Sequence, residues 1–221
     1  MGSLLFLDSA AAEDCAAWVG SGVVRGVTTN ATILVRAGVS SVSAAVKEIL
    51  TAEPGEVHAQ VVSEDDEEAL RQARELAGLD PRVRVKIPFV TSYGRHRAAL
   101  IRRARAAGVP VNVTVCTSLA QLHTALSLEP EYLSVLWCRT RDAGEAPARI
   151  VAALAARRDR TGADTRLLIG SIREPADVTA ALNAPCDIVT VPPAILGPWL
   201  DSPRSVEMAR QFASDARGLV A

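Results

Sequence analysis

The sequence predicts an α/β fold, a single (β/α)8 TIM barrel spanning residues 1–221 with an additional C-terminal helix. Eight short β-type runs recur at intervals of roughly 20 to 35 residues, and helix-type stretches separate them. With 49% hydrophobic residues, the chain can bury one large core, and nothing in its composition requires a second domain.

The expected strands are short runs rich in branched apolar residues. In chain order they are LLFLD (4–8), GVTTN (26–30), EVHAQVV (56–62), VRVKI (83–87), VNVTV (111–115), YLSVL (132–136), RLLIGS (166–171) and DIVTV (187–191). Intervening segments such as EEALRQARELAG have helical apolar spacing, and several end at a glycine, as helices often do. The stretch at about 204–217 is expected to form the extra helix, which would either cap the barrel or reach a neighbouring subunit.

A doubly wound open sheet is the competing topology. It is less favoured because no GxGxxG or GxxxxGK[ST] phosphate loop follows the first expected strand. Eight βα units in 221 residues also fit a closed barrel better.

The charge and composition of the chain exclude several classes of partner. A formal net charge of −1, from 24 basic and 25 acidic residues, gives no field that would attract nucleic acid or an anionic membrane. No apolar run approaches the roughly 20 residues of a membrane span, and the N-terminus lacks the pattern of a secretory signal. We therefore expect a cytoplasmic protein. The cysteines and histidines lack metal-ligand spacing, so we expect neither a metal nor another cofactor.

Polar residues recur on the inward-facing parity of the expected strands, near their C-terminal ends. Barrel enzymes keep their chemistry at this end. Taken singly, each residue has an ordinary structural explanation. Together they indicate a site, because unpaired buried polar groups would each cost roughly 1 to 3 kcal/mol. The set comprises Asp8, Thr28, Asn30, Gln60, Lys86, Asn112, Thr114, Ser134, Ser171 and Arg173.

Lys86 has a specific chemical use inside a barrel. An unperturbed lysine, with a pKa of about 10.4, is almost entirely charged at neutral pH, but burial lowers the pKa and frees the amine as a nucleophile. Such an amine attacks a carbonyl to form a Schiff base. The iminium then accepts electrons as the neighbouring C–C bond breaks. This is class I aldolase chemistry, and it needs no metal.

The same chemistry needs proton transfer, water handling and substrate binding. Asp8 is the candidate for moving the proton of the substrate hydroxyl. The remaining candidates are Gln60 and Thr114 for the water, Thr28, Asn30, Asn112 and Ser134 for substrate hydroxyls, and Arg139, Ser171 and Arg173 for a phosphate group. For Arg139, solvation at the surface is the alternative.

The chain resembles the transaldolase family, and specifically its short-chain branch that includes fructose-6-phosphate aldolase. The resemblance rests on seven segments in family order: FLDSA, GVTTN, AQVVS, VKIP, VPVNVTV, GSIREPADV and DIVTVPPAIL. It implies that Lys86 is the Schiff-base lysine and Asp8 the proton-transfer carboxylate. It also implies phosphorylated sugar substrates and a homo-oligomer, a pentameric ring or a decamer, with the C-terminal helix on a neighbour. The other implied roles are dihydroxyacetone binding at Asn30, Asn112 and Ser134, phosphate binding at Arg139, Ser171 and Arg173, and water handling at Gln60 and Thr114.

Three positions bear on the choice of activity. Gln60 is typical of the aldolases, whereas transaldolases usually carry glutamate there. Leu136 replaces a tyrosine that assists proton transfer in the aldolases, and Ala31 breaks the signature GVTTNP.

Three further inward positions carry unusual residues below the expected site. Glu56 and His58, with Arg84 on the next strand, occupy places where apolar side chains are usual. We expect Arg84 to pair with Glu56 or another buried acceptor, because an unpaired interior guanidinium would be very costly.

The leading hypothesis is a transaldolase-like enzyme of pentose phosphate-type carbohydrate metabolism, which transfers a dihydroxyacetone unit from a ketose phosphate to an aldose phosphate. The alternative is an aldolase that releases or takes up free dihydroxyacetone. A third possibility, of another class, is a barrel that binds sugar phosphates without turning them over.

Overall fold

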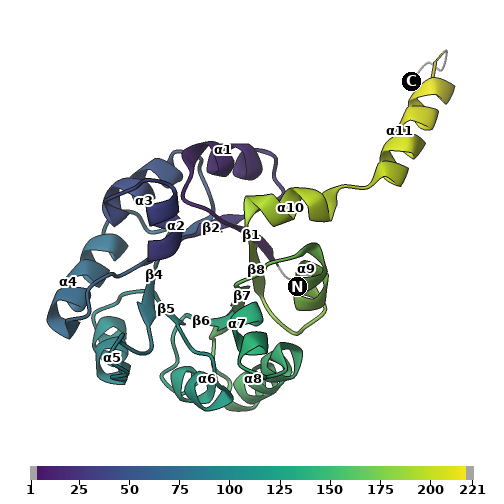
Figure 1. The fold of residues 1–221 in the computed structure, drawn as a ribbon. Helices are drawn as coiled ribbons and strands as arrows, with labels where there is room; N and C mark the ends of the chain where they lie inside the picture. Colours follow the sequence, from purple (N-terminus) through teal and green to yellow (C-terminus); the bar gives the residue numbers. More distant parts are fainter. Residues whose placement is uncertain (1–3, 218–221) are drawn as a thin grey trace.

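The eight strands form one closed parallel barrel. In the computed structural model, which describes residues 4–217, each strand pairs with the next in chain order and β8 closes on β1 (Figure 1). The strands are β1 (Leu4–Asp8), β2 (Gly26–Thr28), β3 (Glu56–Gln60), β4 (Val83–Pro88), β5 (Val111–Thr114), β6 (Tyr132–Leu136), β7 (Arg166–Gly170) and β8 (Ile188–Val191). The expected barrel is confirmed, and residues 1–3 and 218–221 lie outside the described part.

The second and third strands end earlier than the sequence predicts. After β2, the side chain of Asn30 caps the next helix by accepting a hydrogen bond from the Ile33 amide, at 3.0 Å. After β3, the Gln72 side chain accepts from the amide of Val62, at 3.0 Å. After β2 the chain passes directly into the capped helix, and after β3 a side chain replaces a neighbouring strand as the partner of the Val62 amide, so each ladder stops.

Helices surround the barrel on its outer face (Figure 1). They are α1 (Ala12–Gly20), α2 (Ala31–Arg36), α3 (Val42–Leu50), α4 (Asp66–Ala77), α5 (Ala98–Ala106), α6 (Leu119–Leu126), α7 (Trp137–Asp142), α8 (Pro147–Thr161), α9 (Pro175–Leu182) and α10 (Pro193–Leu200). A last helix, α11 (Pro203–Asp215), follows them. Within residues 4–217, no helix is both long and apolar enough to cross a membrane.

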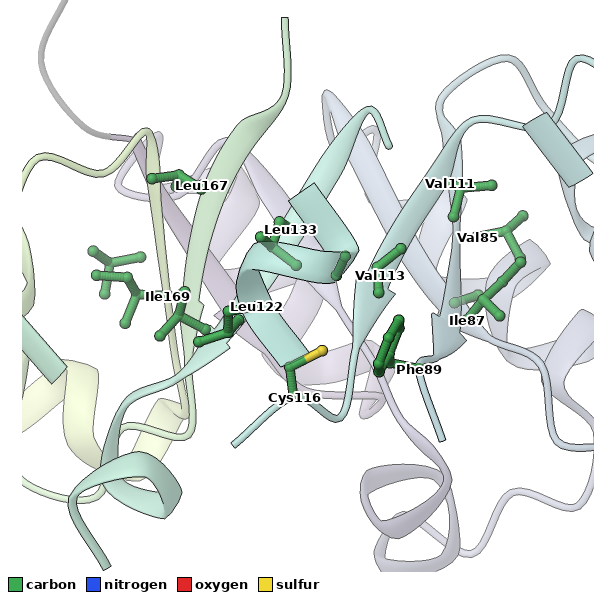
Figure 2. Packing of buried hydrophobic residues seen from close by; sticks show 14 of the residues in the cluster. Val85, Ile87, Phe89, Val111, Val113, Cys116, Leu122, Leu133, Leu167 and Ile169 are labelled. Carbon is green, nitrogen blue, oxygen red and sulfur yellow. The ribbon is translucent and has the colours of Figure 1, made fainter. Parts of the chain in front are cut away.

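The alternation of strand side chains creates two separate layers of packing. In β4, Val85 and Ile87 face the surrounding helices (Figure 2), so Arg84 and Lys86 point into the barrel. The outer layer is large and apolar. The inner apolar cluster is small and consists of Phe6, Tyr132, Leu168 and Ile188. Polar side chains therefore occupy much of the interior.

The extra C-terminal helix is confirmed, and it does not cap the barrel. Figure 1 shows α11 projecting away from the barrel, and none of its residues is buried in the described chain. Its apolar side chains Val206, Met208 and Phe212 are 46%, 52% and 64% exposed. The helix thus presents apolar surface that its own barrel leaves uncovered.

Candidate active site

Lys86 lies inside the barrel near the end of β4. Its side chain is buried, and its Nζ donates a hydrogen bond to the Thr29 carbonyl oxygen at 2.8 Å. Burial lowers the pKa of the amine, although the negative charge of Asp8 partly opposes this effect. The side chain is 7% exposed, and its burial shifts the amine toward the neutral, nucleophilic form.

Asp8 ends β1 and is held by a chain of two threonines. The Thr28 hydroxyl donates to Asp8 Oδ1 at 2.6 Å and lies 2.8 Å from the Thr190 hydroxyl. Thr28 has one hydroxyl proton, so Thr190 must be the donor in the second contact. The Thr28 hydroxyl is thus hydrogen-bonded on both sides and supports Asp8, and its predicted contact with a substrate hydroxyl stays a prediction.

Burial raises the pKa of Asp8, while the charge of Lys86 and the Thr28 hydrogen bond partly lower it. This carboxyl group therefore takes up a proton more readily than an exposed aspartate. Thr190 was not predicted as a site residue. Its place on the same face of β8 as Ile188, which packs inside the barrel, is the signal that indicates it.

Asn112 and Ser134 lie together beside the lysine. Asn112 is paired with Lys86 in the register of β4 and β5. The side chains of Asn112 and Ser134 are buried. The Ser134 hydroxyl donates to Asn112 Oδ1 at 2.8 Å, and Asn112 Nδ2 lies 2.9 Å from His58 Nδ1. The structure thus brings these two residues together at the level of the amine.

Gln60 and Thr114 also lie at this end of the barrel. Gln60 is the register partner of Lys86 on β3, and Thr114 is the partner of Pro88 on β5. Neither side chain is hydrogen-bonded to another residue that the structure describes. Their polar atoms are therefore available to water or a ligand.

Asn30 occupies the N-cap of α2. Its Oδ1 accepts from the Ile33 amide at 3.0 Å, which leaves the Nδ2 group for other contacts. Ala31 stands at the first position of the helix, where proline is common, yet the cap is intact. The departure at Ala31 does not disturb Asn30.

The three predicted phosphate-binding residues lie at the junctions after β6 and β7. The Cys138 amide donates to the Ser171 carbonyl oxygen at 3.3 Å, which joins the two junctions. Arg139 is exposed on α7 and forms no ion pair with any residue from 4 to 217. Arg173 is also exposed, but its Nη2 lies 2.7 Å from Asp142 Oδ2. A phosphate would have to compete with Asp142 for Arg173.

Asp177 organises this corner and was not predicted from the sequence. It is buried at the start of α9 and accepts hydrogen bonds from the Arg173 amide at 3.3 Å and from Arg141 Nη1 at 2.6 Å. The Cys138 thiol donates to the same carboxylate at 3.0 Å. Arg141 is consequently committed to Asp177, and it leaves Arg139 as the freer guanidinium on α7.

Leu136, the last residue of β6, is half-buried and is paired in register with Gly170. A side chain at Gly170 would meet the Thr190 methyl group at 3.3 Å, so the backbone here is packed closely against β8. Leu136 has no proton to transfer.

A second polar network lies below Asn112, centred on Glu56. His58 Nε2 and the Tyr132 hydroxyl lie 3.3 Å and 2.7 Å from Glu56 Oε2. Arg166 Nη1 donates to Tyr132 Oη at 2.7 Å and to Glu56 Oε1 at 3.2 Å. Burial alone would raise the pKa of Glu56, but the hydrogen bonds from His58 and Tyr132 and the charge of Arg84 lower it to about 2. Glu56 is thus a firmly ionised carboxylate.

Arg84 forms an ion pair, as expected, but with a different main partner. Its Nε lies 2.8 Å from Glu131 Oε1, whereas its Nη2 lies 4.0 Å from Glu56 Oε1. Its Nη1 also donates to the Pro81 carbonyl oxygen at 2.8 Å. Glu131 is partly exposed, so Arg84 reaches the rim at the N-terminal end of the barrel and not a fully buried acceptor.

Across residues 4–217, no three histidine, cysteine, aspartate or glutamate side chains are grouped in a way that would hold a metal ion. The site instead consists of an amine, a carboxyl group, amides, hydroxyls and guanidinium groups.

Known proteins with similar structures share the barrel. A mutant of flavocytochrome b2 has a TM-score of 0.59 at 14% identity, over 86% of this chain and 56% of that one. A mutant of mandelate oxidase has a TM-score of 0.58 at 14% identity, over 87% of this chain and 64% of that one. The chain spans little more than half the length of the flavocytochrome. At this identity the likeness shows the fold alone.

The sequence comparisons are more specific. A probable transaldolase of Dehalococcoides mccartyi is 32% identical over 212 residues, covering 96% of both chains. A probable transaldolase of Phenylobacterium zucineum is 33% identical over 216 residues, covering 96% of this chain and 95% of the relative. The family profile described as transaldolase/fructose-6-phosphate aldolase matches residues 5–219. This protein therefore belongs to the transaldolase/fructose-6-phosphate aldolase family.

Proposed function

We propose that this protein is a Schiff-base transaldolase, in which Lys86 carries a dihydroxyacetone unit from a ketose phosphate to an aldose phosphate. The observation that carries the proposal is the buried Lys86 amine, whose pKa is lowered, at the level of Asn112 and within the electrostatic reach of Asp8. A neutral amine in this place can attack a keto carbon.

The reaction follows from the groups present. Lys86 adds to the keto carbon, and loss of water gives an iminium. Asp8 takes the proton of the substrate hydroxyl as the C–C bond breaks, the bonding electrons move into the iminium, and an aldehyde leaves. The resulting enamine attacks the aldehyde carbon of the acceptor, and Asp8 returns the proton to the new oxygen. Hydrolysis of the iminium then releases the product.

The remaining residues bind and orient. Asn112, Ser134 and Asn30 bind the hydroxyls of the three-carbon unit, and Gln60 and Thr114 hold the water of Schiff-base formation and hydrolysis. Thr28 orients Asp8. For the phosphate, Arg139 and Ser171 supply the first contacts, and Arg173 joins them by exchanging Asp142 for the ligand.

Borohydride trapping tests the covalent step. Incubation with fructose 6-phosphate and borohydride is expected to add a covalent mass to the intact protein, because reduction converts the iminium to a stable secondary amine. The chain contains two lysines, Lys86 and the exposed Lys47 on α3, so the Lys47→Arg variant is a matched control and should be trapped equally well. If no ketose donor gives an adduct, both enzyme hypotheses fail and a non-catalytic sugar-phosphate-binding barrel is left.

A fructose-6-phosphate aldolase that uses free dihydroxyacetone is the second candidate, and Gln60 favours it. The two activities share the adduct and differ in what removes the three-carbon unit. Incubation with fructose 6-phosphate, with and without erythrose 4-phosphate, separates them. The transaldolase yields product only with the acceptor, whereas the aldolase releases dihydroxyacetone without it.

The projecting helix α11 supports a homo-oligomer in which it contacts a neighbouring copy. Val206, Met208 and Phe212 lie within two turns of one another and are exposed on the single chain. Covering them with another subunit would bury apolar surface.

We expect the full chain to sediment as an oligomer and the double variant Met208→Glu, Phe212→Glu to sediment as smaller species, since charged side chains would be buried in the contact. Arg210→Glu on the same helix is the matched control for added negative charge. Sedimentation of the unaltered chain as a monomer at micromolar concentration would contradict the proposal.

A further inference from the structure

His58 joins the two polar networks of the barrel. Its ring is fully buried, with Nδ1 2.9 Å from Asn112 Nδ2 and Nε2 3.3 Å from Glu56 Oε2. It also stands edge-on to Tyr132 and Phe6, with centroid distances of 4.7 Å and 5.7 Å. These contacts fix the plane of the imidazole.

The neighbours of His58 determine where its proton lies. Ser134 donates to Asn112 Oδ1, so the Asn112 amide group faces His58 and donates to Nδ1. Nδ1 is then an acceptor, and the proton is on Nε2, directed at the Glu56 carboxylate. Glu56 in turn is held by Tyr132 and Arg166. Each of these bonds orients the next group toward the site.

The last group in this series of hydrogen bonds is the Asn112 amide. Its oxygen receives one bond from Ser134 and one of its two N–H groups is used by His58, so one N–H and one lone pair are left. Asn112 is also the register partner of Lys86. The direction of its free groups therefore decides how a molecule bound to Lys86 is held.

We propose that His58, backed by Glu56, is a positioning residue that fixes the Asn112 amide in the orientation that binds the dihydroxyacetone unit on Lys86. This inference rests on the proposed Schiff-base function. An apolar residue would fill the same space, as Phe6, Leu168 and Ile188 do nearby, without the desolvation that a buried imidazole–carboxylate pair requires.

The charge state of His58 suits this role. Its ring faces the charged groups of Glu56, Lys86 and Arg84. Burial and the two cations lower its pKa to about 4 against the opposing effect of Glu56, so the ring is neutral at neutral pH. A protonated ring would offer Asn112 a second donor and turn its amide around.

Three substitutions separate positioning from packing. In His58→Asn the side-chain oxygen can lie near the place of Nδ1 and keep the bond to Asn112, whereas in His58→Gln the amide lies near the place of Nε2 and keeps the bond to Glu56. His58→Phe keeps the ring and neither bond. We expect His58→Phe and His58→Gln to lower kcat/KM for fructose 6-phosphate about tenfold, the value of one lost hydrogen bond, and His58→Asn to lose about threefold or less.

The KM for the erythrose 4-phosphate acceptor is expected to change less than twofold in all three variants, because Asn112 contacts the donor unit. Full trapping at saturating donor should persist, since Lys86 is untouched. Equal losses in the asparagine and glutamine variants, or an unchanged kcat/KM in His58→Phe, would overturn the inference. If His58→Phe fails to fold, the comparison of His58→Asn with His58→Gln still tests the inference. Absence of an adduct in the unaltered protein would instead refute the proposed function.

Discussion

The Lys86→Met variant is expected to form no borohydride-trapped adduct and to lose at least about four orders of magnitude in turnover, the scale seen when a covalent nucleophile is removed. Methionine has a similar length and no amine, so it fills the same space without chemistry. Turnover is measured with fructose 6-phosphate and erythrose 4-phosphate. Lys47→Met, exposed on α3, is the control and should keep full activity. A fully active Lys86→Met protein would contradict the proposal.

The same variant should be more stable than the unaltered protein, by an amount that depends on pH. Burial lowers the pKa of Lys86 in the folded state, whereas the unfolded chain titrates near its ordinary value of about 10.4. Between these two values the unfolded state binds more protons, so the contribution of Lys86 to the free energy of unfolding becomes more favourable as pH rises. Urea titrations should therefore show a difference in the free energy of unfolding between the two proteins that becomes smaller toward high pH. A difference independent of pH would show that the buried charge is not its cause.

The Asp8→Asn variant is expected to lower kcat about a hundredfold to a thousandfold, because an amide cannot accept the proton of the substrate hydroxyl. Lys86 is unaltered, so the Schiff base should still form and should accumulate before C–C cleavage. Mass spectrometry distinguishes the two states. The unaltered protein should trap mostly the three-carbon unit, and Asp8→Asn should trap mostly the intact hexose phosphate.

Asp159→Asn, on the exposed surface of α8, is the matched control and should behave as the unaltered protein. An Asp8→Asn protein with an ordinary kcat would assign the proton transfer to another group. A low kcat with three-carbon adducts alone would place the defect after cleavage.

The fold was predictable because its signals are local. Each strand has branched apolar residues with a fixed parity, and this parity placed Asp8, Lys86 and Asn112 inside the barrel, where the structure has them. Strand ends were less predictable. Whether Val62 continues β3 depends on the Gln72 side chain, which lies ten residues away and takes over its amide.

Part of the site depends on contacts that a single strand pattern does not contain. The Thr190 hydroxyl bonds to the Thr28 hydroxyl, although the two residues are 162 positions apart in the sequence. Asp177 accepts hydrogen bonds from Arg141 on α7 and from the Arg173 amide after β7. The partner of Arg84 depended on the reach of its side chain to Glu131 at the rim. Each of these contacts joins separate βα units, so only the closed barrel determines it.

The buried amine of Lys86, and no other amine, is expected to carry the substrate. Peptide mapping after borohydride reduction with fructose 6-phosphate tests it directly, because trypsin cleaves after an unmodified Lys86 but not after a substituted one. The expected result is a peptide spanning residues 85–95 that carries the adduct, with loss of the peptide spanning 87–95. An adduct on Lys47 would contradict this expectation. Undiminished recovery of the 87–95 peptide, which forms only when Lys86 is unmodified, would also contradict it if the protein turns over the substrate.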